Sequence, residues 1–211
     1  MALDLEEQEQ VDELKAWWNR YGNLVLLGFT AFLLAVAGMQ GWRYYQTKQS
    51  AESAAMFETM QNALAANDLK RVRDVTGAIL DQFPGTAYAV NAALISARVN
   101  FETGDVKSAK AQLQWVVDHA KQDAPQQMAR LRLAGILLDE KSYVEALKLL
   151  DAPHDDAFAG LVADLKGDVL AAQGKIPEAS TAYKMALSKS KPNSAYHNLV
   201  QVKLDALGAG K

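Results

Sequence analysis

Hydrophobic and polar residues divide this chain of 211 residues into two very different parts. From Tyr21 to Trp42 there are 22 consecutive residues without a charge, and Arg20 and Arg43 bound this run. A helix of that length reaches about 33 Å, which is enough to cross a hydrocarbon core of roughly 30 Å. The pattern therefore predicts one transmembrane helix over residues 21–42, between a tail of residues 1–20 and a water-soluble domain of residues 43–211.

Aromatic residues flank the uncharged run on both sides, as is typical of membrane interfaces: Trp17, Trp18, Tyr21, Trp42, Tyr44 and Tyr45. The alternative is a cleaved signal peptide, because Ala35 and Ala37 are small residues at a spacing that signal peptidases cut, which would leave Gly38 as the mature N-terminus. A signal peptide begins with a short basic segment, whereas residues 1–20 contain six carboxylates and two basic residues. These features favour a permanent anchor.

Beyond Ser50 the apolar residues recur at intervals of three and four, as in Leu94, Ala97 and Phe101, and this period predicts helices. Turn signals follow one another at separations of 37, 37 and 33 residues: Asn67-Asp68, Gly104-Asp105, Lys141-Ser142 and Gly174-Lys175. Periods in the thirties indicate repeats that each consist of a helix pair.

Small residues recur where the two helices of each pair would cross. Five residues after the turns stand Val72, Ala109, Ala146 and Ala179, and twelve residues before the last three of these stand Ala97, Ala134 and Gly167. Two antiparallel helices approach closely only where their side chains are small. Proline cannot continue a helix, so the second helices should end before Pro84, Pro153 and Pro192.

This arrangement of small and apolar residues resembles tetratricopeptide repeats, although the tryptophan position of the consensus is filled by Ala93, Arg130 and Ala163. The resemblance implies an all-α fold: a single N-terminal transmembrane helix followed by a tetratricopeptide-like solenoid of helix pairs. The number of repeats stays open.

Charge and composition exclude several classes of function. Residues 43–211 contain 20 basic and 19 acidic residues and no basic cluster, so we expect no nucleic-acid partner, because binding phosphates needs clustered cations. The chain has no cysteine, which excludes disulfides and thiolate chemistry. His119, His154 and His197 are isolated from one another and are interpreted as surface or structural residues. The segment from His154 to Asp156 is interpreted as a polar loop, and the alternative is a divalent-ion site there. We therefore predict no catalytic residue, no metal site and no cofactor, and a protein that is not an enzyme.

A solenoid of helix pairs presents a concave surface, which its first helices form. By the alignment above, this surface exposes a largely apolar set of candidate polypeptide-binding residues: Asn91, Leu94, Arg98, Phe101, Met128, Leu131 and Leu138. A clamp for a terminal carboxylate is disfavoured, because the matching positions hold Leu94/Arg98, Leu131/Gly135 and Asp164/Asp168. The competing interpretation is that these residues belong to the core between the helices, since the rotation of each helix stays open.

Within the membrane run, Gly28, Ala31, Ala35 and Gly38 follow one another at spacings of three, four and three. Small residues on one face allow close contact with another membrane helix, so this face is a candidate packing surface. The alternative is that glycine and alanine are simply frequent in membrane helices.

The acidic tail, the WW-x-x-YG-N segment from Trp17 to Asn23, the W-x-x-YQ segment from Trp42 to Gln46 and the helical repeats together resemble the YfgM-type proteins, ancillary subunits of the bacterial Sec translocon. The resemblance implies a bacterial inner-membrane protein with residues 1–20 in the cytoplasm and residues 43–211 in the periplasm. Basic residues near the anchor do not decide this orientation, because two lie on each side.

The implied partners are the lipid bilayer, the SecYEG channel, the membrane-anchored chaperone PpiD and newly translocated, unfolded periplasmic and outer-membrane proteins. The implied function is a chaperone-like scaffold that assists the folding or handover of such proteins. The alternative is a purely structural adaptor that holds another subunit and binds no client.

Overall fold

The computed structural model describes residues 5–208, in which nine α-helices, one short 3₁₀ helix and no strand occur. These residues form two compact units, one up to Gln49 and one from Ser50 onward. The predicted all-α fold is confirmed.

The first unit is one helix, the N-terminal part of α1 (Leu5–Ala65). This helix contains the uncharged run of residues 21–42, whose large apolar side chains are exposed, and it is long and apolar enough to cross a membrane. Helical structure extends beyond both ends of the run, so the ends of the helix do not define the span. The limits at residues 21 and 42 remain predictions.

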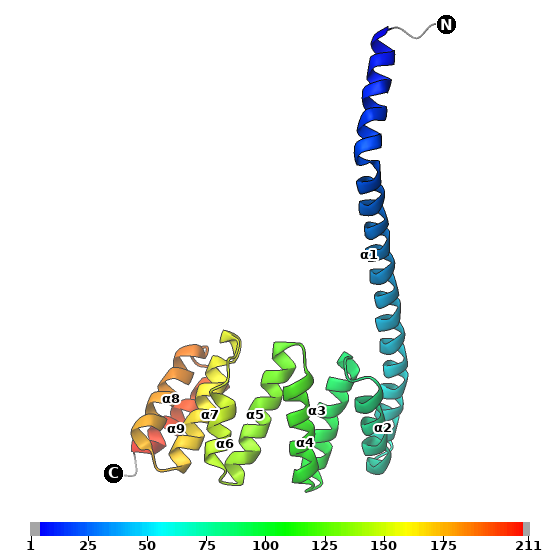
Figure 1. Cartoon of the computed structure of the whole chain (residues 1–211). Helices are drawn as coiled ribbons and strands as arrows, with labels where there is room; N and C mark the ends of the chain where they lie inside the picture. The colour runs from blue at the N-terminus through cyan, green and yellow to red at the C-terminus, as the bar shows by residue number, and fades with distance from the viewer. Residues whose placement is uncertain (1–4, 209–211) are drawn as a thin grey trace. The chain divides into compact units, whose positions relative to one another are not determined.

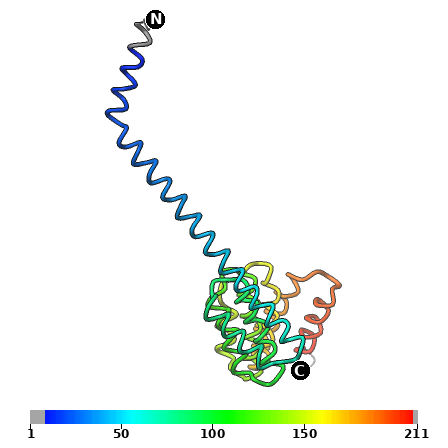
Figure 2. The backbone as a smooth tube through the Cα atoms, turned by 90° about the vertical axis from the view of Figure 1, so that its right-hand side faces the viewer, coloured from blue at the N-terminus to red at the C-terminus, as the bar shows by residue number. Residues whose placement is uncertain are grey.

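The second unit consists of stacked helix hairpins, which lie in order along the stack in Figure 1 and overlap in projection in Figure 2. The end of α1 pairs with α2 (Leu69–Gln82), and α3 (Ala87–Glu102) pairs with α4 (Val106–His119). Next come α5 (Asp123–Asp139) with α6 (Tyr143–Leu150), then η1 (Asp156–Phe158) and α7 (Ala159–Ala172) with α8 (Ile176–Lys189). A single helix, α9 (Ala195–Gly208), follows.

The four tight turns within the hairpins share one backbone geometry. Their left-handed residues are those that the sequence marked, with φ between 55° and 83°: Asn67, Gly104, Lys141 and Gly174. In each turn the amide of the residue after the left-handed one donates a hydrogen bond to the carbonyl five positions earlier, as Asp105 does to Asn100 at 2.8 Å. Asp68 and Asp105 also cap the helices that follow. Local turn chemistry therefore sets the repeat boundaries.

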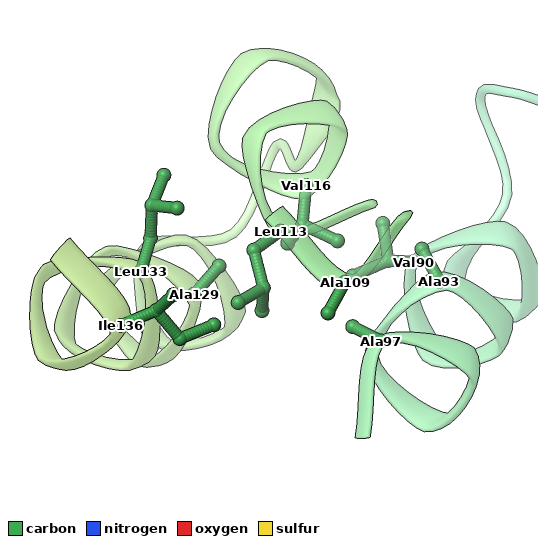
Figure 3. Packing of buried hydrophobic residues seen from close by; sticks show 9 residues of the cluster. All are labelled: Val90, Ala93, Ala97, Ala109, Leu113, Val116, Ala129, Leu133 and Ile136. Atoms are coloured by element: carbon green, nitrogen blue, oxygen red, sulfur yellow. The ribbon is translucent and has the colours of Figure 1, made fainter. Parts of the chain in front are cut away.

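Small residues lie at the helix crossings, as predicted. Ala109, Ala146 and Ala179 are completely buried, and Ala97 and Ala134 are buried opposite the first two. Figure 3 shows Leu113 and Val116 of α4 between the side chains of α3 and α5, so the second helix of one pair also packs on the first helix of the next. Each hairpin thus shares its core with its neighbour.

The third pair has the shortest second helix. α6 ends at Leu150 after eight residues, before Pro153 as predicted. The carbonyl of Pro153 accepts hydrogen bonds from Gln127 Nε2 at 2.8 Å and from Arg130 Nη1 at 3.0 Å. The loop after α6 therefore packs back onto α5. Pro84 and Pro192 likewise follow the ends of α2 and α8.

The helix crossings make a matched pair of glycine substitutions informative. A Cβ atom on Gly167 would overlap the ring of Tyr183, whereas a Cβ atom on Gly135 would meet no atom within 4 Å. We expect Gly167→Ala to destabilise the protein by about 1–3 kcal/mol through overpacking, and Gly135→Ala to stabilise it by about 0.4–1 kcal/mol by restricting the unfolded chain. Urea unfolding of the full-length protein in detergent, followed by circular dichroism, measures both. A Gly167→Ala protein as stable as the wild type would contradict the close crossing.

Candidate polypeptide-binding surface

Exposed apolar side chains of the repeat unit concentrate on its first helices and on α9. Six of the eight large ones lie there: Leu64, Phe101, Met128, Leu161, Leu199 and Val202. The two on second helices are Val144 and Met185. Since second helices cover the opposite side of each pair, this bias makes the surface of the first helices a candidate for binding apolar ligands.

A hollow of about 550 Å³ opens on this surface between α3 and α5. Its buried floor includes Ala97, Leu113 of α4 and Ile136. Around it lie Arg98, Phe101, Arg132, Gly135, Leu138 and Asp139. Phe101 remains 46 % exposed, which is unusual for an aromatic side chain beside its own core and leaves its ring accessible to a ligand.

The structure distributes the predicted groove residues over three environments. Arg98, Phe101 and Leu138 line the hollow. Leu94 and Leu131 are half-buried and pack against the hydrophobic core, and Leu138 does the same while also lining the hollow. Asn91 lines a separate depression of about 150 Å³ beside the start of α3, and Met128 is exposed outside the hollow. Binding by any of them remains a prediction.

Several residues of the surface were not predicted. Gly135 and Arg132 line the hollow, and Gly135 occupies the position that Arg98 holds one repeat earlier. Leu161, Leu199 and Val202 extend the apolar exposure to α7 and α9. Extending the alignment of first helices to the fourth repeat would have found Leu161. The turn residues Pro192 and Asn193 precede α9, but they do not indicate which side chains of that helix are exposed.

The charged residues around the hollow differ in their partners. Arg98 Nε contacts Glu102 Oε1 at 2.7 Å, and this bond raises the pKa of the already basic guanidinium. The side chains of Arg132 and Asp139 have no hydrogen-bond or ion-pair partner among residues 9–208, whose side chains the structure describes. One cation and one anion at the edge of the hollow are therefore available to a ligand.

The matching positions of the fourth pair are occupied from within the chain. Lys203 Nζ of α9 lies 2.9 Å from Asp164 Oδ1 and 2.7 Å from Asp168 Oδ2, and the Tyr183 hydroxyl donates to Asp168 Oδ1 at 2.8 Å. Burial alone would lower the pKa of Lys203, but the hydrogen bonds to the two carboxylates raise it overall. This cluster ties α9 to α7, so these carboxylates are not free to bind a ligand.

α9 is held further by its tyrosine. The Tyr196 hydroxyl donates to the carbonyl of Gly160 at 3.0 Å, and burial, with the nearby Asp164 and Asp168, raises the pKa of Tyr196 to about 12. Val200 is completely buried against α8 in the same cluster. The last helix therefore closes the stack through both apolar and polar contacts.

The three histidines each have a local partner. His119 stacks on Trp115 with ring centroids 4.4 Å apart, the ring of His154 contacts the Ala152 carbonyl, and the ring of His197 contacts the Ser190 hydroxyl. In the segment after His154, Asp155 caps η1, and Asp156 pairs with Lys189 at 2.6 Å. These contacts agree with the structural interpretation of the histidines.

In the uncharged run of α1, residues 21–42, the small residues form an open face. A Cβ atom on Gly28 or on Gly38 would meet no atom within 4 Å, and Ala31 and Ala35 are exposed. The face is accessible to another helix, and its role in packing remains a prediction.

Comparison with known proteins agrees with this architecture. Residues 15–209 match the family described as a tetratricopeptide repeat-like domain. The chain is 33 % identical over 211 residues to a protein of Neisseria gonorrhoeae, with 98 % of this chain and 100 % of that protein covered. It is also 29 % identical to a protein of Haemophilus influenzae, with 88 % and 91 % covered, and 28 % identical to one of Escherichia coli, with 98 % and 99 % covered.

Fold and surface together define a helix-repeat protein with one helix able to span a membrane at its N-terminal end. Each of these three relatives is named an ancillary SecYEG translocon subunit. The chain belongs to this YfgM-type family of tetratricopeptide repeat-like proteins.

The ionic cluster at α9 can be tested with one substitution and a matched control. Lys203→Met leaves Asp164 and Asp168 half-buried without their cation, so we expect a loss of stability on the order of 1–2 kcal/mol and faster amide hydrogen exchange in α9. Lys189→Met removes a pair whose carboxylate is mostly exposed and should change stability by less than about 0.5 kcal/mol. Equal exchange of α9 in both variants would contradict a fastening role for Lys203.

Proposed function

We propose that this chain is an ancillary subunit of the SecYEG translocon that assists newly translocated proteins at the periplasmic side of the inner membrane. Residues 21–42 anchor it in the bilayer, residues 1–20 lie in the cytoplasm, and residues 43–211 carry the repeats in the periplasm. Full-length similarity to proteins named as such subunits supports the association with the channel. The observation that supports client binding is the apolar hollow between α3 and α5.

The hollow suits weak binding of unfolded segments. Its floor is apolar, its edge combines Phe101 and Leu138 with three charged residues, and it is wide enough for large side chains. Unfolded chains expose such side chains before they fold, and burial of apolar area stabilises the contact without a specific sequence. A protein that must release its clients benefits from an affinity of this modest kind.

The anchor compensates for weak affinity. The anchor keeps the hollow beside the channel exit, where it meets an emerging chain at a high effective concentration. Weak binding to the hollow is then enough to capture the chain. The repeat fold suggests an adaptor without catalysis, and no step of this mechanism needs nucleotide hydrolysis.

A structural adaptor is the second candidate. Leu94 and Leu131 pack against the core, so the exposed apolar surface is smaller than the sequence predicts. A surface of this smaller size is suited to holding one folded partner. The PpiD-type membrane-anchored chaperone is the partner that this candidate would hold. An adaptor would crosslink to one partner and ignore unfolded clients.

The proposed topology predicts opposite labelling of the two ends. The chain has no cysteine, so single cysteines introduced by Gln10→Cys and by Lys184→Cys report without background. In cells with a permeable outer membrane, a membrane-impermeant maleimide should label the Lys184→Cys protein and should label the Gln10→Cys protein only after lysis. The reverse pattern would contradict the orientation, and an N-terminus at Gly38 would show cleavage instead of anchoring.

The tethering mechanism predicts that capture of clients depends on the anchor. A photo-crosslinking residue at position 101 would be placed in the full-length protein and in a periplasmic form without residues 1–49, at matched cellular amounts. We expect at least about tenfold more client crosslinks from the anchored protein, because of its higher effective concentration. Equal capture by both forms would refute tethering, and crosslinks to a single folded protein would favour the adaptor.

A further inference from the structure

One position of the concave surface lacks a side chain. The residue after the crossing residue of each first helix is Gln61, Arg98, Gly135 and Asp168 in the four pairs. Among the first helices of these pairs, only α5 has a glycine there. A Cβ atom on Gly135 would meet nothing within 4 Å, so the space above it belongs to the hollow and not to the core.

Neighbouring repeats show what a side chain does at this position. Asp168 fills it in the fourth pair and binds Lys203, and Arg98 fills it in the second and binds Glu102. Gly135 leaves the backbone of α5 open beside Phe101 and Leu138, two large apolar side chains that line the same hollow. A large apolar side chain of a ligand can therefore enter above Gly135 and be surrounded by apolar groups.

The charges around the opening specify the neighbours of that side chain. Arg132 lies one helical turn before Gly135 and therefore on the same side of α5, it is exposed, and no carboxylate of residues 9–208 pairs with it. The other guanidinium of the hollow, on Arg98, is already bound to Glu102. A carboxylate on the flank of the entering apolar side chain that faces Arg132 would complete the pairing of this guanidinium. The unpaired Asp139 lies about 10 Å along α5 from Arg132, beyond Gly135, and therefore faces the other flank of that side chain.

We propose that Gly135 and Arg132 determine which segments this surface accepts: polypeptide segments in which a large apolar side chain is flanked by an acidic residue. The apolar side chain enters above Gly135, and the acidic neighbour pairs with the Arg132 guanidinium. This inference rests on the proposed client-binding function and adds to it the chemistry of the preferred segment.

The test uses full-length protein in nanodiscs and fluorescein-labelled peptides of glycine and serine with a central pair of residues. The centre is Phe-Leu or Ala-Ala. One flank always carries a lysine, which can pair with Asp139, and the other flank carries a glutamate or a lysine; the glutamate form is made in both orders, so that peptide direction does not matter. Fluorescence anisotropy measures the affinities. We expect binding of the Phe-Leu peptides only, with the glutamate form bound about two- to fivefold more tightly, as for an exposed ion pair.

Two pairs of variants separate the contributions. Gly135→Leu fills the hollow from inside and should weaken binding of the Phe-Leu peptides about tenfold or more. Gly77→Leu is its control, because Gly77 is an exposed helical glycine on α2 whose Cβ atom would also meet nothing. Arg132→Glu should reverse the preference to the lysine peptide, and Arg71→Glu on exposed α2 should leave it unchanged. Thermal unfolding confirms that each variant folds.

The outcomes distinguish the two proposals. Wild-type binding that survives Gly135→Leu, or a glutamate preference that survives Arg132→Glu, overturns this inference and leaves client binding intact. If the wild-type protein binds none of the Phe-Leu peptides, the client-binding function itself fails, and this inference fails with it.

Discussion

The repeat unit depends on the close approach of the two helices in every pair. Fully buried alanines at positions 109, 146 and 179 allow this approach, and the left-handed turns at Asn67, Gly104, Lys141 and Gly174 direct each second helix back along the first. Because each pair buries only part of its apolar surface by itself, the pairs must stack, and stacking leaves one side of the first helices without a covering layer. The exposed apolar surface is thus a consequence of how the core is built.

Two glycines of similar sequence context have opposite roles in this construction. Gly167 lies where the ring of Tyr183 needs its space, so it belongs to the core, whereas Gly135 faces open space and contributes to the hollow. The difference arises because the crossing residue faces the partner helix and the residue after it is rotated by about 100° toward the concave side. At the crossing position a glycine is required for packing, whereas one position later a glycine leaves space that a ligand can enter.

The carboxylates of the fourth pair show how the same surface can be used by the chain itself. Asp164 and Asp168 occupy positions at which other tetratricopeptide-like proteins could bind ligands, yet Lys203 of α9 already pairs with both. Closing the stack in this way covers the inner face of the last hairpin, while the hollow lined by the predicted residues lies in the middle of the unit, between α3 and α5. The family relationship agrees with such a surface as a place for protein contacts, while the identity of those contacts is the proposal made above.

The sequence by itself determined the spanning helix, the all-helical class, the turn positions and the ends of three second helices, because charge, periodicity, proline and turn residues act within a few neighbouring positions. It also indicated Arg98, Phe101 and Leu138 as surface residues, and the structure places them around the hollow. Only the tertiary structure decided that Leu94 and Leu131 join the core, that Gly135 is open and that Lys203 reaches Asp164 across 39 residues. Helix rotation and the docking of α9 depend on contacts between distant segments, and local patterns in one sequence do not encode these contacts.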